Sequence, residues 1–232
     1  MENDTSKTST SNVSTKKPHG EVWLLSYTHA FHFNIIRYCN RPFENEYQMN
    51  SELERRWNLL VQPDDIVIHV GDLTAGLKGR KNELKAHIMT LAGRKVLVKG
   101  NHDHQDDEFY LSAGFESVVD YITINNILFA HVPDTLDAES SHPHPWAAIT
   151  KKLREAFMPK LIIHGHIHRN DTPEFEGHFN CAADRHNFMP FTLQSALERS
   201  NLGDLAKSAN EDIYTWLEQQ KVAADEKNTI TL

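Results

Sequence analysis

Short apolar runs that end in polar residues recur along this chain of 232 residues. Four of these runs are rich in β-branched and leucine side chains and have the length of buried strands, while stretches between them show helical spacing. The predicted strands are 21–26, 66–70, 95–99 and 161–164, and the predicted helices are 51–61, 80–92 and 145–157. Strands that alternate with helices indicate an α/β fold, in which ligands gather beyond the carboxyl ends of the strands.

The rest of the chain is less periodic. Residues 120–131 are typical of a hairpin that turns at Asn125 and Asn126, residues 179–183 of a further strand, and residues 193–217 of helices interrupted near Gly203. The polar end beyond them is expected to fray. The predicted organisation is a disordered polar tail at 1–19, one globular domain at 20–193, and a C-terminal helical extension and tail at 194–232.

Composition disfavours several classes of protein. No apolar run approaches the ~20 residues of a membrane span, and the polar first residues lack the apolar middle of a secretory signal. The net charge of −8 argues against broad electrostatic capture of nucleic acid, which needs a surplus of basic residues. The two cysteines, Cys39 and Cys181, have no zinc-site spacing. We therefore expect a soluble, cytoplasmic protein that acts on a small substrate.

Residues with the character of metal ligands follow the predicted strands. Asp72 comes directly after Gly71 at a strand end, where its carboxylate is well placed to bridge two ions. Pairs of divalent ions ~3.5–4 Å apart hold the attacking and leaving oxygens in phosphate ester cleavage, and they take mixed carboxylate and imidazole ligands. The other candidate ligands are His29, Asn101, His131, His166 and His168.

The chain resembles the calcineurin-like metallophosphoesterases in five motifs that occur in the order of that family. The motifs are Tyr27-Thr28-His29, Gly71-Asp72, Gly100-Asn101-His102-Asp103, His131 and Gly165-His166-Ile167-His168. Residues 26–43 further resemble a small bacterial and phage branch, whose members carry an Asn-Ile-Ile run followed by Arg-Pro-Phe. The resemblance implies a four-layer α-β-β-α sandwich with two mixed β-sheets.

The resemblance also implies roles for the motif residues and a cofactor of two divalent metal ions, with manganese favoured and iron, zinc or nickel as alternatives. The first ion would be held at the position of Tyr27 and by His29, Asp72 and His168. The second ion would be held by Asp72, Asn101, His131 and His166. His102 would stand unligated beside the substrate with Asp103 as its orienting partner, and His32 would face the substrate.

Tyr27 departs from the family pattern, which has aspartate at this position. A phenol has a free pKa of ~10, so it binds a divalent ion only if the metal lowers that pKa strongly. Ligation by the phenol is one hypothesis, a weakly bound first ion is a second, and a ring that fills the place of the ion is a third. We favour a weakened first site with the second site intact.

These features predict a metal-dependent phosphoesterase that cleaves a phosphate mono- or diester with a metal-bound hydroxide. One alternative is a catalytically impaired pseudoenzyme that binds a phosphorylated ligand or a protein partner, which only Tyr27 favours. A second alternative is a nuclease, because DNA-repair phosphoesterases share these motifs. Among the remaining histidines, His69 and His164 are expected in the core, and His178 at the surface.

Overall fold

The structure is a computed structural model that describes residues 19–77, 79–136, 144–168 and 175–230, with side chains described up to residue 223. The predicted tail therefore lies outside the described residues, apart from its last position. The strands are β1 (Val22–Leu25), β2 (Ile66–His69), β3 (Arg94–Val98), β4 (Phe115–Val119), β5 (Ile122–Ile124), β6 (Ile127–Phe129), β7 (Leu161–His164), β8 (His178–Asn180) and β9 (Phe191–Thr192). The helices are α1 (Phe33–Tyr38), α2 (Glu46–Leu60), α3 (Lys81–Thr90), α4 (Asp107–Ser112), α5 (Pro145–Phe157), α6 (Leu193–Arg199) and α7 (Ala206–Ile230), with the 3-10 turns η1 (Ala183–Arg185) and η2 (Gly203–Leu205).

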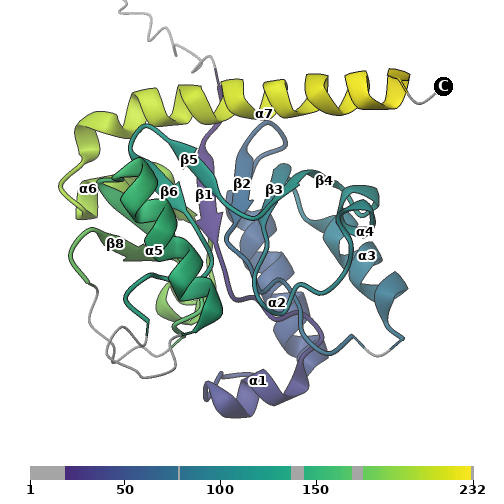
Figure 1. Cartoon of the computed structure of the whole chain (residues 1–232). Helices are drawn as coiled ribbons and strands as arrows, with labels where there is room; N and C mark the ends of the chain where they lie inside the picture. The colour runs from purple at the N-terminus through teal and green to yellow at the C-terminus, as the bar shows by residue number, and fades with distance from the viewer. Residues whose placement is uncertain (1–18, 78, 137–143, 169–174, 231–232) are drawn as a thin grey trace, which may run out of the picture.

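Two mixed sheets form the centre of the molecule (Figure 1). The five-stranded sheet has the order β4-β3-β2-β1-β9, in which only β9 runs antiparallel. The four-stranded sheet has the order β5-β6-β7-β8, in which β5 and β6 form the predicted hairpin. Asn125 and Asn126 both have positive φ, as a tight two-residue hairpin turn requires.

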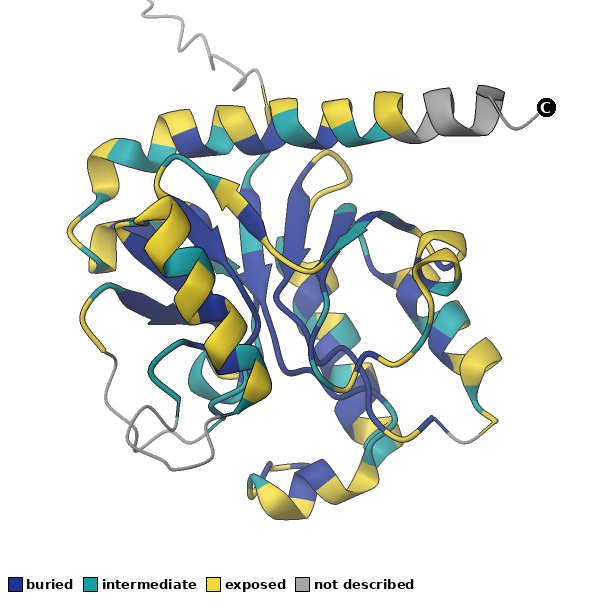
Figure 2. Ribbon diagram, viewed as in Figure 1, coloured by how far each residue is buried: buried dark blue, intermediate teal, exposed yellow. Residues whose placement is uncertain are grey.

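Alternation along the strands explains the layers, because successive side chains point to opposite faces of a sheet. Ile66 and Ile68 of β2 join the core between the two sheets, whereas Val67 joins the cluster that α2 covers with Trp57. On the outer face of the second sheet, Ile162 packs with Leu153 of α5. The dark blue strands of Figure 2 lie between these partly exposed helices. The predicted four-layer α-β-β-α sandwich is therefore confirmed.

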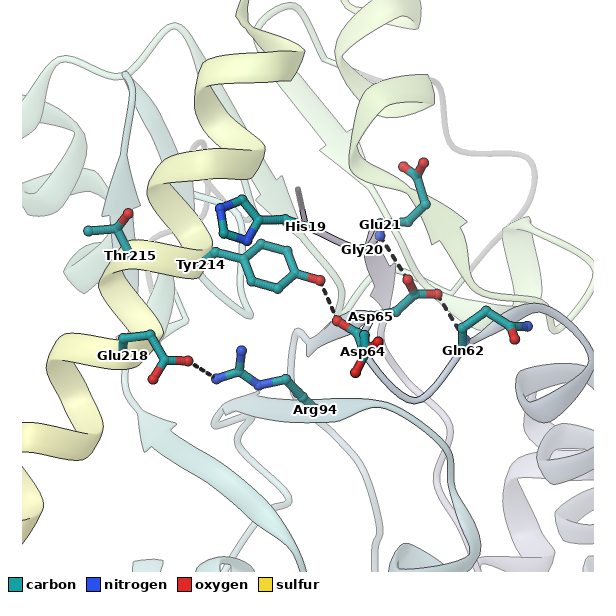
Figure 3. A pocket seen from close by; sticks show the side chains of 10 residues that line it. All are labelled: His19, Gly20, Glu21, Gln62, Asp64, Asp65, Arg94, Tyr214, Thr215 and Glu218. Carbon is teal, nitrogen blue, oxygen red and sulfur yellow. Dashed lines mark hydrogen bonds and ion pairs between the residues drawn. The ribbon is translucent and has the colours of Figure 1, made fainter. Parts of the chain in front are cut away.

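Helix α7 lies along the end of the molecule opposite α1 (Figure 1). Its apolar face, with Ile213 and Leu217, belongs to the same core as the sheets, so the helices after residue 193 complete that core. A pocket of about 560 Å³ opens beside α7 (Figure 3). Its polar groups bond to one another: the Tyr214 hydroxyl donates to the Asp64 carbonyl oxygen at 2.6 Å, and Arg94 pairs with Glu218. The pocket thus lies where α7 is attached to the chain end that precedes β1.

Two expectations are corrected, and some short elements were not predicted. Helix α7 continues to Ile230, so the prediction that the chain frays after residue 217 is wrong. His178 is buried, and its ring bonds to the Asp134 carboxylate at 2.7 Å, so it is not a surface residue. The short helices α1 and α4 and the strand β4 were not predicted. Within the described residues, no helix is both long and apolar enough to cross a membrane.

Candidate metal centre

The motif loops meet at the carboxyl ends of the parallel strands. Backbone bonds join the first two loops, from the Tyr27 amide to the Gly71 carbonyl at 3.0 Å and from the His29 amide to the Asp72 carbonyl at 3.1 Å. Tyr27, His29, Asp72 and His166 all have φ between 50° and 62°. Non-glycine residues rarely adopt this left-handed region, and they do so where surrounding structure fixes them. The packing of the loops therefore holds the candidate ligands in strained backbone conformations.

Asp72, His131 and His166 form a group whose donor atoms all lie within 4.8 Å of one another. The His131 Nδ1 lies 2.8 Å from the Val70 carbonyl oxygen, which makes Nδ1 the protonated nitrogen and leaves the Nε2 lone pair free. That Nε2 faces the Asp72 Oδ2 at 3.2 Å, and neither atom has a hydrogen-bond partner although both are buried. Two buried acceptors that face each other require a cation between them, either a proton or a metal ion. This donor set fits a divalent metal.

Asn101 and His166 extend the same group. The Asn101 Oδ1 lies 3.0 Å from the His166 Nδ1, so the amide oxygen and the imidazole predicted for the second ion are adjacent. Burial, more than the repulsion from His131, lowers the pKa of His166 to about 3, which keeps its imidazole neutral as a metal ligand must be. The structure thus brings together all four residues predicted for the second ion.

The residues predicted for the first ion are arranged differently. His29 is buried with both ring nitrogens unpartnered, and its Nε2 lies 3.5 Å from the Asp72 Oδ2. The Tyr27 ring packs edge-on against the His29 ring at 4.1 Å between centroids and stacks on the His168 ring at 4.9 Å. The His168 Nδ1 lies 3.1 Å from the Cys39 thiol sulfur. The tyrosine ring therefore contacts both imidazoles that the first ion would need.

The phenol of Tyr27 is neutral in the metal-free site. Burial, helped by the nearby Asp72 carboxylate, raises the pKa of Tyr27 well above its ordinary value. Burial also lowers the pKa of His29 to about 4, so that imidazole is neutral. A neutral phenol replaces the carboxylate of the family, which removes one negative charge from the first site.

Asp103 does not orient His102 as predicted. Its carboxylate instead accepts three backbone N–H groups, from Asp72 at 2.8 Å, Leu73 at 3.0 Å and Gly100 at 2.8 Å, and none of its described bonds reaches the His102 ring. A side chain at Gly100 would overlap Asp72, so the two loops approach as closely as their backbones allow. Asp103 therefore fixes the loop that carries Asp72.

His102 and His32 keep their predicted roles as hypotheses. The His102 backbone N–H donates to the Asp72 Oδ1 at 3.0 Å, while its ring is exposed 5.4 Å from the His29 ring. The half-buried ring of His32 lies 5.5 Å from the His29 ring on another side. Both imidazoles are thus close enough to the candidate metal centre to meet a bound phosphate ester.

Arg41 is a site residue that the ligand pattern did not single out, although it lies in the Arg-Pro-Phe run. Its buried guanidinium donates to the Tyr27 carbonyl at 2.7 Å and to the Thr28 carbonyl at 2.9 Å, and it forms a two-pronged ion pair with Asp184 at 2.8 and 2.7 Å. Asp184 belongs to η1, which follows β8. Arg41 therefore ties the first motif loop to the second sheet.

Replacing Arg41 by lysine is expected to lower the free energy of unfolding by about 2–4 kcal/mol, because one ammonium cannot serve both carbonyls and both carboxylate oxygens of a buried pair. Urea denaturation of the metal-free protein measures this change. Arg55→Lys is the matched control, since the Arg55 side chain is 60% exposed and pairs with Glu52 on the same helix. An equal loss in both variants would contradict the assignment.

Comparisons with known proteins give relatives in sequence and in fold. No protein-family model matches the chain. The chain is 30% identical over 200 residues to the uncharacterized protein MJ1445 of Methanocaldococcus jannaschii, an alignment that covers 82% of this chain and 97% of MJ1445. It is 27% identical over 168 residues to the Gene 66 protein of Mycobacterium phage L5, covering 63% of this chain and 77% of the phage protein. The solved structure of AQ665, a protein of unknown function from Aquifex aeolicus, matches with a TM-score of 0.62 at 24% identity and covers 77% of this chain and 98% of AQ665.

The chain belongs to the family that includes MJ1445. Its sandwich of two mixed sheets shares the fold of AQ665, and its strand-end motifs occur in the order that gives the sequence its resemblance to the calcineurin-like phosphoesterases.

Proposed function

We propose that the chain is a metal-dependent hydrolase of a small phosphate mono- or diester. The observation that carries this proposal is the buried pair of acceptors, Asp72 Oδ2 and His131 Nε2, beside His166. Asp72, Asn101, His131 and His166 would hold a divalent ion, and His29 with His168 would contribute to a weaker or empty first site. Manganese suits these mixed oxygen and nitrogen donors, with iron, zinc and nickel as alternatives.

Bound divalent ions would neutralise charge on the ester oxygens and lower the pKa of water. The chain itself supplies the remaining functions. Asp103 holds the loop that carries Asp72 through its backbone, and the bond to the Val70 carbonyl fixes the ring of His131. The exposed His102 imidazole can donate a proton to the leaving oxygen. We further propose that this activity is cytoplasmic, in a reducing compartment where the two free cysteine thiols stay reduced.

The test is hydrolysis of bis(p-nitrophenyl) phosphate and p-nitrophenyl phosphate by the full chain loaded in turn with manganese, iron, zinc and nickel. We expect product release that stops on chelation and returns when metal is restored. Metal content per chain is measured on the same samples. Failure to cleave either ester with any metal, when the Tyr27→Asp variant does cleave, would exclude this activity for the natural sequence.

The Tyr27 ring favours a second candidate, a phosphate-binding pseudoenzyme. The ring packs against both imidazoles of the first site, those of His29 and His168. In this case the metal-loaded protein would bind inorganic phosphate and release no product from either ester. Calorimetry with phosphate separates this candidate from a protein that neither binds nor cleaves. Short single-stranded oligonucleotides, added to the same assays, test the nuclease alternative.

A further inference from the structure

A line of rings leads from the candidate metal centre to the surface. The buried His29 ring lies 5.5 Å from the His32 ring, and the His32 ring lies 6.3 Å from the ring of Tyr38. Exposure rises along this line, from His29 at 1% through the half-buried His32 to Tyr38 at 71%. Helix α1, which ends at Tyr38, projects from the end of the molecule opposite α7 (Figure 1). An exposed aromatic side chain thus stands at the outer end of a line of tilted and edge-on rings that leads to this centre.

The chemistry of this line points to a particular kind of ester. The Nδ1 of His32 is buried and lacks a partner, so it can bond to a polar group of a ligand. The exposed face of Tyr38 offers a stacking surface, and stacking on such rings is how proteins hold unpaired nucleobases. We propose that the substrate is a nucleotide whose base stacks on Tyr38 while its phosphate lies at the metal centre. This inference rests on the proposed phosphoesterase function.

The spacing argues against an aryl phosphate such as phosphotyrosine. In phosphotyrosine the phosphate is attached directly to the ring, whereas Tyr38 is separated from His29 by the His32 ring. A ligand that reaches both Tyr38 and Asp72 therefore needs a spacer between phosphate and ring, which the sugar of a nucleotide provides. The net charge of −8 also favours a mononucleotide or a short strand over a long polyanion.

The experiment compares AMP with ribose 5-phosphate, which shares the sugar and the phosphate and lacks the base. Binding to the manganese-loaded full chain is measured by calorimetry, with phosphate release monitored to correct for turnover. We expect AMP to bind about tenfold more tightly, the effect of one base stacked on an aromatic side chain. Tyr38→Ala should reduce the ratio of the AMP affinity to the ribose 5-phosphate affinity to about one, and it should leave the affinity for ribose 5-phosphate unchanged. Tyr38→Phe should preserve the ratio.

Tyr121→Ala is the control, because Tyr121 is also exposed, at 38%, and precedes β5 away from this line of rings. It should leave the ratio unchanged. Equal affinities of the natural chain for the two ligands, or a ratio that survives Tyr38→Ala, would overturn the base-stacking proposal while leaving phosphate binding intact. If neither ligand binds and no ester is cleaved, both the base-stacking proposal and the proposed phosphoesterase function fail.

Discussion

Replacing Asp72 by asparagine is expected to abolish the stabilisation that metal ions give to the protein and to lower ester hydrolysis at least about 100-fold, as when one electrostatic group of an active site is removed. Its carboxylate faces His131 at 3.2 Å and His29 at 3.5 Å, so it is the one anion shared by both predicted ion sites. Burial alone would raise the pKa of Asp72, but the His131 and His29 rings hold that pKa below its ordinary value. An uncharged amide cannot offer that attraction to a dication.

Thermal unfolding with and without manganese measures this effect directly. An ion that binds only the folded chain raises the midpoint temperature of unfolding, and the rise is larger when the ion binds more tightly. Asp103→Asn is the matched control. The Asp103 carboxylate accepts three backbone N–H groups. In the Asn variant the amide nitrogen faces one of these donors, which lowers the free energy of unfolding by about 1–3 kcal/mol. We expect that variant to lose stability in the metal-free state and to keep a metal-induced rise. A metal-induced rise that persists in Asp72→Asn would contradict the assignment of this centre.

The positions of the candidate ligands could be predicted because each follows a strand that is buried on both faces. Such strands are continuous apolar runs in the sequence, and the parallel strands of one sheet end at the same edge. That rule placed Asp72 and Asn101 together, whereas His166 follows β7 of the second sheet and was placed beside them by the resemblance. In the structure the donor atoms of Asp72 and His166 lie within 4.8 Å of each other, and the Asn101 amide oxygen lies 3.0 Å from the His166 Nδ1. The six-residue helices α1 and α4 were missed because two turns carry too little periodicity to be recognised.

The roles of Asp103 and Arg41 depend on contacts that spacing does not encode. Asp103 was expected to orient its neighbour His102, but the direction of its carboxylate is set by the backbone of a loop about 30 residues earlier in the chain. Arg41 pairs with Asp184, which lies 143 residues further on, and the residues next to Arg41 in the sequence give no sign of such a partner. Buried polar groups of this kind follow from how the loops meet, which the local sequence leaves open.

Replacing Tyr27 by aspartate is expected to raise the metal content from one ion per chain to two and to increase the affinity for the added ion on the order of 100-fold, comparable with strong effects of groups around metal ligands. The phenol is neutral because burial raises its pKa, so a carboxylate at this position adds a negative charge next to His29. Removing the ring also removes the stacking contact that Tyr27 makes with His168. Hydrolysis should increase with the second ion, since two ions stabilise both oxygens of the displacement.

The same substitution should destabilise the metal-free protein. The Tyr27 side chain is 7% exposed and belongs to a core cluster with Ile36 and Phe43, so losing the ring costs about 3–5 kcal/mol, as for other buried aromatics. Inductively coupled plasma analysis of dialysed protein and urea denaturation with and without manganese measure the two opposite effects. Tyr27→Phe separates the hypotheses for the natural residue, because it keeps the ring and removes the hydroxyl. If the ring fills the place of the ion, Tyr27→Phe binds the same number of ions as the natural chain, whereas loss of an ion in that variant would mean that the phenol oxygen is itself a ligand.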